Sequence, residues 1–100
     1  MFIAMNRFKI IIGKESDFIN IWKNRETLLN SVPGFKEFHL LQGDSTNDFT
    51  LFVSHAIWES ANDFENWTKS EAFRKAHSNA GANKGIYLGP PVFEGFQVIL

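Results

Sequence analysis

The spacing of apolar residues changes several times along this chain, and the order of those changes restricts the fold more than any other feature. Residues 2–12 alternate between two faces, as a β-strand does. After Gly13, apolar residues recur at helical spacing over residues 16–31. Ser16 is placed to cap the start of this helix and Pro33-Gly34 to end it. The chain is therefore predicted to open with a strand followed by a helix.

The next segments predict a hairpin and two short helices. Residues 35–42 and 48–58 read as strands, and the polar stretch at 43–47 predicts the turn between them. Ser60 and Ser70 each precede a helical pattern, and serine is a residue type that caps helix starts.

A long segment precedes the final strand, which is expected over residues 92–100. Residues 78–91 form a 14-residue segment with three glycines, two prolines and two asparagines. A loop of that length in a compact domain usually serves a function or moves. The complete order, β-α-β-β-α-β, is that of the ferredoxin-like α+β fold, an antiparallel sheet with helices on one face.

The two faces of the predicted sheet differ in what they bury. The helix-covered face receives one row of the first strand, namely Phe2, Ala4, Asn6, Phe8, Ile10 and Ile12. We expect the open face to carry Ile3, Met5 and Ile11 together with members of the Phe52/Trp58 and Phe96/Val98 rows. That face would be more apolar than a solvated sheet, so we expect a homodimer formed through it.

Composition excludes several functions. A length of 100 residues predicts one domain spanning 1–100. The net charge of −1, with acidic and basic residues mixed, does not suit nucleic acid, and the lack of cysteine excludes disulfides, thiolate metal sites and thiol catalysis. Asn6, Arg7 and Lys9 interrupt the apolar N-terminus, so we expect a cytoplasmic protein without a signal peptide or membrane span. The 15 aromatic residues suit walls for a flat ligand or a flat interface.

Three residues are candidates for chemistry, although each also fits a structural role. Asn6 lies in an apolar row, where an unpaired carboxamide costs about 1–3 kcal/mol, so it bonds either to local backbone or to a ligand. Trp67 and Phe64 have ordinary core spacing. In one continuous helix Trp67 and His77 would lie about 15 Å apart, but a break at Ser70 would let both border one cavity. His39 and His55 are expected to be structural, since no histidine spacing is typical of zinc or di-iron sites.

The sequence resembles a known family at these positions. The strand with Asn6-Arg7, the Pro33-Gly34-Phe35 turn and above all the run from Trp67 to His77, W-x-K-S-x-x-F-x-x-A-H, look like the IsdG-type haem-degrading monooxygenases. These enzymes belong to the antibiotic biosynthesis monooxygenase (ABM) superfamily. The resemblance spans nearly the whole chain.

The resemblance implies a dimeric α+β barrel with one haem cleft per subunit, between sheet and helices. His77 would be the axial ligand of the haem iron, and Asn6 would direct the oxygen species toward the porphyrin edge. Trp67 would press the macrocycle out of plane. Trp22, Phe64 and Phe73 would line the cleft.

Haem would be both substrate and cofactor, opened by O₂ with electrons from an external reductase so that iron is released. Segment 78–91 would cover the cleft. Nearby cations that could meet the propionates are Arg25, Arg74, Lys75 and Lys84.

Two alternatives stay open. The first is a cofactor-independent ABM-type monooxygenase that oxidises polyphenols or quinols, which would not need His77 as an iron ligand. The second is a non-catalytic haem-binding or storage dimer, which would not need the Asn6 amide. Turnover without haem would favour the former, and a haem complex that persists under reductant would favour the latter.

Overall fold

The computed structural model describes residues 1–24, 29–76 and 85–100, with backbone only at 72, 75 and 76. One four-stranded antiparallel sheet has the order β2-β3-β1-β4. The strands are β1 (Phe2–Ile11), β2 (Phe35–Ser45), β3 (Phe49–Trp58) and β4 (Val92–Gln97).

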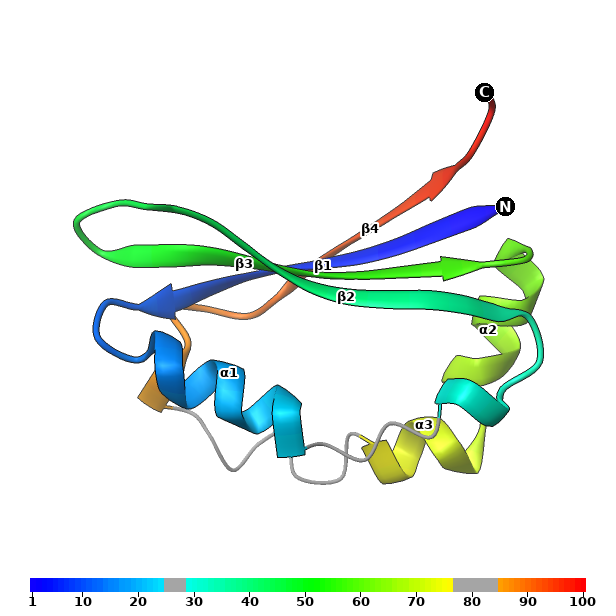
Figure 1. Cartoon of the computed structure of the whole chain (residues 1–100), viewed down its shortest axis with the longest axis horizontal. Helices are drawn as coiled ribbons and strands as arrows, with labels where there is room; N and C mark the ends of the chain where they lie inside the picture. Colours follow the sequence, from blue (N-terminus) through cyan, green and yellow to red (C-terminus); the bar gives the residue numbers. More distant parts are fainter. Residues whose placement is uncertain (25–28, 77–84) are drawn as a thin grey trace.

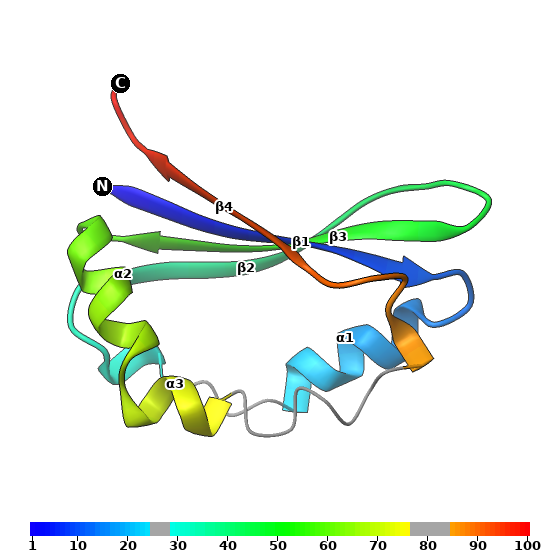
Figure 2. The same cartoon turned by 180° about the vertical axis from the view of Figure 1, so that it is seen from behind.

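The helices all lie on one side of this sheet (Figure 1). They are α1 (Glu15–Asn24), the 3₁₀ turn η1 (Leu29–Ser31), α2 (Ala61–Thr68) and α3 (Glu71–Ala76). The view from behind shows α1 beneath one end of the sheet and α2 and α3 beneath the other (Figure 2). The predicted ferredoxin-like α+β architecture is thus confirmed.

The first helix differs from its prediction at both ends. It begins at Glu15, so the assignment of Ser16 as its cap is wrong. Gly13 turns the chain with φ +93°, and its N–H donates to the Glu15 carboxylate at 2.9 Å. The described part of the helix spans Glu15–Asn24, and Leu29–Ser31 forms a 3₁₀ turn, so the α-helix predicted over residues 29–31 is wrong.

Both serine caps in the second half are confirmed. The Asp63 N–H donates to Ser60 Oγ at 3.2 Å, and the Phe73 N–H donates to Ser70 Oγ at 3.2 Å. Ser70 Oγ also donates to the Trp67 carbonyl oxygen at 2.6 Å. The Ser70 bonds lie between the end of α2 and the start of α3, so the predicted break at Ser70 is present.

Two strand boundaries also depart from expectation. The hairpin pairing continues as far as Ser45 opposite Thr50, which shortens the turn expected at 43–47. β4 ends at Gln97 and not at Leu100. Its neighbour β1 starts at Phe2, and the Val98 N–H donates to the Met1 carbonyl at 2.9 Å. Because β1 does not extend further in this direction, residues 99 and 100 lie beyond its end.

The sheet register corrects one face assignment. Phe52 lies opposite Phe8 and Trp58 lies opposite Phe2, and cross-strand partners share a face. Phe52 and Trp58 therefore point to the helices, where both are buried, and their predicted place on the open face is wrong. Phe96 lies opposite Ile3 on the open face, as predicted, and is 47% exposed.

The buried core is divided into two clusters on the helix-covered face. The α1 cluster consists of the buried Ile10, Phe18 and Phe52 with surrounding apolar side chains, including Phe8 and Trp22. The α2 cluster consists of the buried Ala4, Leu29 and Trp58 with partly buried neighbours: Phe2, Val32, Phe35, Phe38, Ala56, Phe64 and Trp67. No helix among the described residues is long and apolar enough to cross a membrane.

Candidate functional site

A strip of small and polar residues crosses the helix-covered face between the rings of the two clusters, and two of its members, Ala4 and Ala56, also belong to the α2 cluster. We call it the central strip, and it follows directly from the register. Ala4 lies between Ala56 and Gly95, and Asn6 lies between Ser54 and Phe93 on the neighbouring strands. The small residues of the strip are Ala4, Asn6, Ser54, Ala56 and Gly95. These side chains are short, although the Phe2 ring occupies the space beside Gly95.

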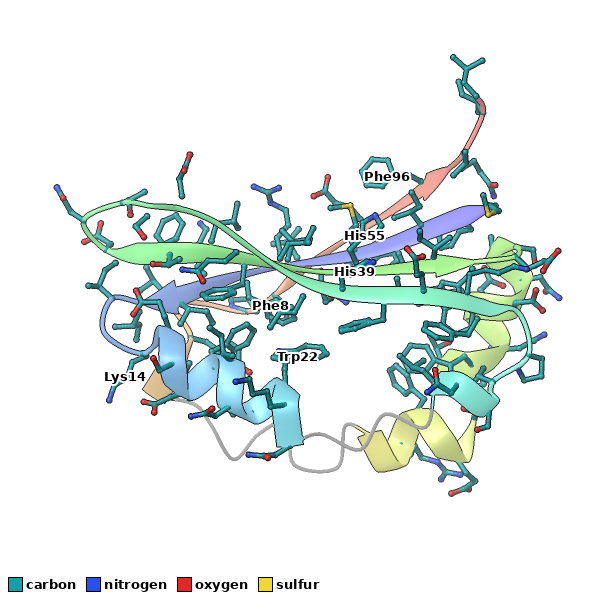
Figure 3. The ribbon with its side chains drawn as sticks, in the orientation of Figure 1. Phe8, Lys14, Trp22, His39, His55 and Phe96 are labelled. Carbon is teal, nitrogen blue, oxygen red and sulfur yellow. The ribbon has the colours of Figure 1, made fainter. Side chains whose placement is uncertain are left out.

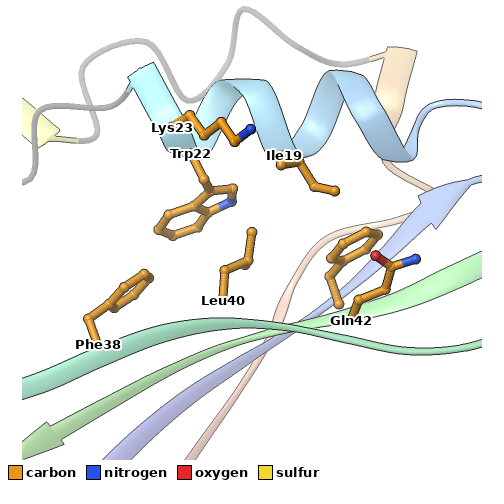
Figure 4. A pocket seen from close by; sticks show the side chains of 7 residues that line it. Ile19, Trp22, Lys23, Phe38, Leu40 and Gln42 are labelled. Atoms are coloured by element: carbon orange, nitrogen blue, oxygen red, sulfur yellow. The ribbon is translucent and has the colours of Figure 1, made fainter.

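A cavity of about 340 Å³ lies beside the strip, between α1 and the sheet. Its walls are mostly apolar, with Lys23 and Gln42 as the polar members; the full lining is Ile19, Trp22, Lys23, Phe38, Leu40, Gln42 and Phe52 (Figure 4). Leu40 is the cross-strand partner of Ser54, which in turn is the partner of Asn6. With about 4.8 Å between adjacent strands, the cavity wall lies about 10 Å from the backbone of Asn6.

Trp22 forms the aromatic wall of this cavity. It projects from α1 toward the sheet (Figure 3) and stacks on Phe38 with ring centroids 5.4 Å apart and an interplanar angle of 22°. Phe8 and Phe18 contact its edge at 6.0 and 6.2 Å. The sequence singled out Trp22 as a wall of the cleft, and the structure places it on a cavity.

Asn6 lies in the central strip, on the face toward the helices, because its partners are Ser54 and Phe93. Its side chain is partly buried. Within the described residues, its carboxamide forms no hydrogen bond with either backbone or side chains. A bond to local backbone would have explained Asn6 structurally, and that explanation finds no support among the described residues.

Trp67, Phe64 and Phe73 lie together at the other end of the face. Trp67 contacts Trp58 at 5.4 Å, Phe64 at 6.1 Å and Phe73 at 4.8 Å between ring centroids. Phe64 also stacks on Phe93, the β4 partner of Asn6, at 5.4 Å. These rings border the central strip from the side opposite Trp22.

Several predicted residues fall elsewhere. His77, Arg25 and Lys84 lie outside the described residues, as do residues 78–84 of segment 78–91 and the side chain of Lys75. Arg74 is exposed and pairs with Glu71 on its own helix.

The two remaining histidines lie away from the strip. His39 and His55 are cross-strand partners on the open face, with rings 6.4 Å apart. Figure 3 shows His55 and Phe96 on the side away from the helices. Among the described residues, no three His, Asp or Glu side chains are grouped to hold a metal ion.

Sequence reasoning missed the floor of the site. Ser54 is one of two polar residues in its row of β3, the other being Thr50, so it stood out less than Asn6, which is the single polar residue in its row of β1. Phe38 and Leu40 gave no such signal, because apolar residues on a strand are ordinary core. The lining of the cavity depends on the strand order and on the register of the hairpin, which the structure shows.

The comparison with family models decides the relationship. The model described as Antibiotic biosynthesis monooxygenase matches residues 1–79. The chain belongs to this family. It is thus an ABM-family monooxygenase, as the run from Trp67 to His77 predicted.

Sequence relatives of this ABM-family chain include two Bacillus proteins named heme-degrading monooxygenase. The proteins from Bacillus thuringiensis (strain Al Hakam) and Bacillus cereus (strain AH187) are each 33% identical over 81 residues, covering 81% of this chain and 75% of the relative.

Solved structures share the ABM fold with this chain. The heme-degrader MhuD from Mycobacterium tuberculosis, solved with two hemes bound in its active site, superposes with a TM-score of 0.77 at 24% identity over 100% of this chain and 97% of that chain. SnoaB, a cofactor-independent oxygenase from Streptomyces nogalater, gives a TM-score of 0.71 at 18% identity over 99% and 93%. The fold is therefore common to a heme-degrader and a cofactor-independent oxygenase.

Proposed function

We propose that this ABM-family monooxygenase degrades haem, binding it between the sheet and the helices and opening the porphyrin with O₂ and electrons from an external reductase. The observation that carries the proposal is the Asn6 carboxamide. It lies partly buried on an apolar face and has no hydrogen-bond partner within the described residues. Its aromatic neighbours are Phe8 of the α1 cluster and Phe93, which stacks on Phe64. The two Bacillus relatives named heme-degrading monooxygenase support the choice of substrate.

The described residues suit a large flat ligand. The central strip provides a floor of short side chains, and Trp22 and Trp67 stand on opposite sides of it, on α1 and α2. Apolar walls with a few polar groups are typical of cofactor and small-molecule sites. An aromatic face on either side would hold a porphyrin by stacking and exclude water from it.

Each proposed residue has a distinct part. Bound haem supplies the iron at which O₂ is activated, and His77 would hold that iron through a ring nitrogen. The Asn6 amide would donate a hydrogen bond that orients the reacting oxygen, a preorganised donor of the kind that lowers reaction barriers. Trp67 would press against the porphyrin plane, with Phe64 and Phe73 behind it.

The same proposal includes a homodimer formed through the open face of the sheet. Ile3, Ile57 and Phe96 form one continuous apolar row there, and Val53 and Leu41 lie next to Arg7 in another. The isolated chain exposes 6556 Å², whereas scaling predicts about 5,800 Å² for a folded protein of this mass. We expect sedimentation to give a dimer at micromolar concentration and Phe96→Glu to give a monomer; a monomeric wild type would contradict the dimer.

Haem titration followed by reduction tests the function. We expect a Soret band on adding hemin, and its loss with iron release once ascorbate is added in air. His77→Ala should lose the band. Asn6→Ala should keep it but turn over about a hundredfold more slowly or worse, while Asn20→Ala, the same change on the exposed side of α1, should match wild type.

Two outcomes would contradict haem degradation. A wild type that binds no haem but oxidises a quinol in air would be a cofactor-independent oxygenase of the SnoaB kind. A haem complex that keeps its Soret band under reductant and air would be a carrier.

A further inference from the structure

We infer that the cavity between α1 and the sheet receives an edge of the haem that carries a propionate, and that the Lys23 ammonium pairs with that carboxylate. This inference rests on the proposed function and adds to it a contact that orients the ligand. It starts from the lining of the cavity. Among the described residues that form this lining, Lys23 is the single charged one, and the other polar member, Gln42, is an uncharged amide.

Lys23 lies at the rim of the cavity. It follows Trp22 in the last turn of the described helix, and its side chain is exposed. Figure 4 shows Lys23 beside Trp22 on α1, while Phe38, Leu40 and Gln42 face them from the sheet. An apolar interior with one cation at its rim fits a ligand that has a hydrophobic body and a terminal acid.

The charge of Lys23 is not used elsewhere in the described part of the chain. Other side chains form the ion pairs found there: Arg7–Glu94, Lys36–Glu59, His39–Glu37 and Arg74–Glu71. The residues one turn before Lys23 on the helix, Ile19 and Asn20, are uncharged, so neither of them neutralises it. Lys23 is thus free to pair with an anionic ligand group.

The position of the cavity relative to Asn6 suits one edge of a porphyrin. In the proposed function the Asn6 amide lies beside the reacting oxygen, and the cavity wall at Leu40 lies two strands away, about 10 Å across the sheet. A propionate extends beyond the macrocycle on two methylene groups, so its acid lies outward from the ring. The cavity of about 340 Å³ is at the small end of the range for ligand sites, about 300–1,000 Å³, which suits an edge of the porphyrin and not the whole of it.

Lys23 also has an ordinary structural explanation, from which the test must separate the proposed one. A lysine in the last turn of a helix interacts favourably with the helix dipole. That interaction does not depend on whether the ligand carries an acid. The two roles therefore differ in how a Lys23 variant responds when the propionates are esterified.

Binding of hemin and of hemin dimethyl ester, which lacks both carboxylate charges, tests the assignment. We expect Lys23→Gln to weaken hemin binding about threefold to fivefold, the effect of one partly exposed ion pair, and to leave binding of the ester unchanged. Lys23→Glu should weaken hemin binding about tenfold or more, because like charges repel. Lys23→Arg should match wild type, as should Lys14→Gln, which removes an exposed lysine at the far end of α1 (Figure 3).

Metal-free protoporphyrin IX provides a readout that depends on neither iron nor turnover. Its binding is followed by the quenching of tryptophan fluorescence, and Lys23→Gln should weaken it by the same factor as it weakens hemin binding. The difference between wild type and variant should shrink between about 0.01 M and 1 M salt, because salt screens a pair near the surface.

Separate results would overturn separate claims. If Lys23→Gln changed the affinities for hemin and for its ester equally, or changed neither, the ion pair would be refuted while haem degradation stood. A loss of protoporphyrin affinity that does not shrink with salt would refute it as well. A wild type that binds neither hemin nor protoporphyrin IX would instead refute the proposed function.

Discussion

The two ends of the helix-covered face are built differently, although both are aromatic. At the α1 end, a chain of hydrogen bonds runs from Ser45 through Thr50 to Glu15, and it fixes the helix start above the buried Phe18. At the α2 end, rings pack around Trp58, which contacts Phe35, Phe64 and Trp67.

This difference assigns different work to the two tryptophans. Trp67 is packed against three rings of its own end of the molecule. Trp22 lies two turns beyond the polar anchor of α1, about 10 Å along the axis, and one side of it borders the cavity. Trp22 also contacts three rings, those of Phe8, Phe18 and Phe38. Both tryptophans therefore belong to the core, but Trp22 has one side on the cavity, so its truncation removes less packing.

Removing the centre of the α1 cluster has the largest expected effect. Phe18 is fully buried and contacts Phe8, Trp22, Phe52 and Tyr87. Phe18→Ala should lower the free energy of unfolding by about 3–5 kcal/mol, measured by urea denaturation. A loss below about 1 kcal/mol, the size expected for an exposed position, would show that this end of the face is not a packed core.

The two tryptophans should separate stability from binding. Trp67→Ala should lower the free energy of unfolding by about 2–3 kcal/mol, the lower part of the range for large-to-small changes because the side chain is only partly buried. Trp22→Ala should cost less stability but weaken haem binding more than tenfold, about 1.4 kcal/mol. Equal losses of stability and of haem affinity in both variants would contradict the distinction between the two ends.

Breaking the polar anchor should have a smaller effect that depends on pH. Thr50→Val leaves Glu15 and Ser45 without their partner and should cost about 1–2 kcal/mol at neutral pH. The hydrogen bond from Thr50 lowers the pKa of Glu15 from its ordinary value of 4.5. A lowered pKa in the folded state stabilises the protein above that ordinary value, and this contribution is lost as pH falls through the folded-state pKa.

Urea denaturation at pH 7 and at pH 3 measures this difference. Wild type should lose more stability than Thr50→Val between the two values, because the variant has already lost the bond that lowers the Glu15 pKa. An identical loss in both proteins would show that the anchor is not linked to Glu15.

Strand alternation and serine caps made most of the fold predictable from sequence. The order of elements, the caps at Ser60 and Ser70 and the helix-facing row of β1 all follow from local chemistry. Alternation did not show that Phe52 and Trp58 point to the helix-covered face. The pattern along one strand does not say which of its two rows pairs with Phe8 and Phe2 on the neighbouring strand. Only the register between strands supplies that.

The candidate site was predictable to a similar extent. Asn6 and Trp22 stand out in sequence, the first because it is polar in an apolar row and the second because it matched an aromatic position of the family. Ser54 and Leu40 do not stand out in sequence. Their places, Ser54 opposite Asn6 and Leu40 beside the cavity, depend on the register between strands. Ser16 failed as a cap because the helix begins at Glu15, which places Ser16 inside the first turn, where the Phe18 N–H already bonds to the Lys14 carbonyl.

Haem degradation directed by Asn6 is tested most directly by the absorption spectrum of the haem-loaded protein, recorded with reductant in air and again without oxygen. We expect the Soret band of wild type to disappear in air, with one iron released for each haem lost, and to persist without oxygen. Asn6→Ala should retain the band in both conditions. A wild-type band that survives reductant in air, or an Asn6→Ala variant that loses it as fast as wild type, would contradict the central role given to the amide on the central strip.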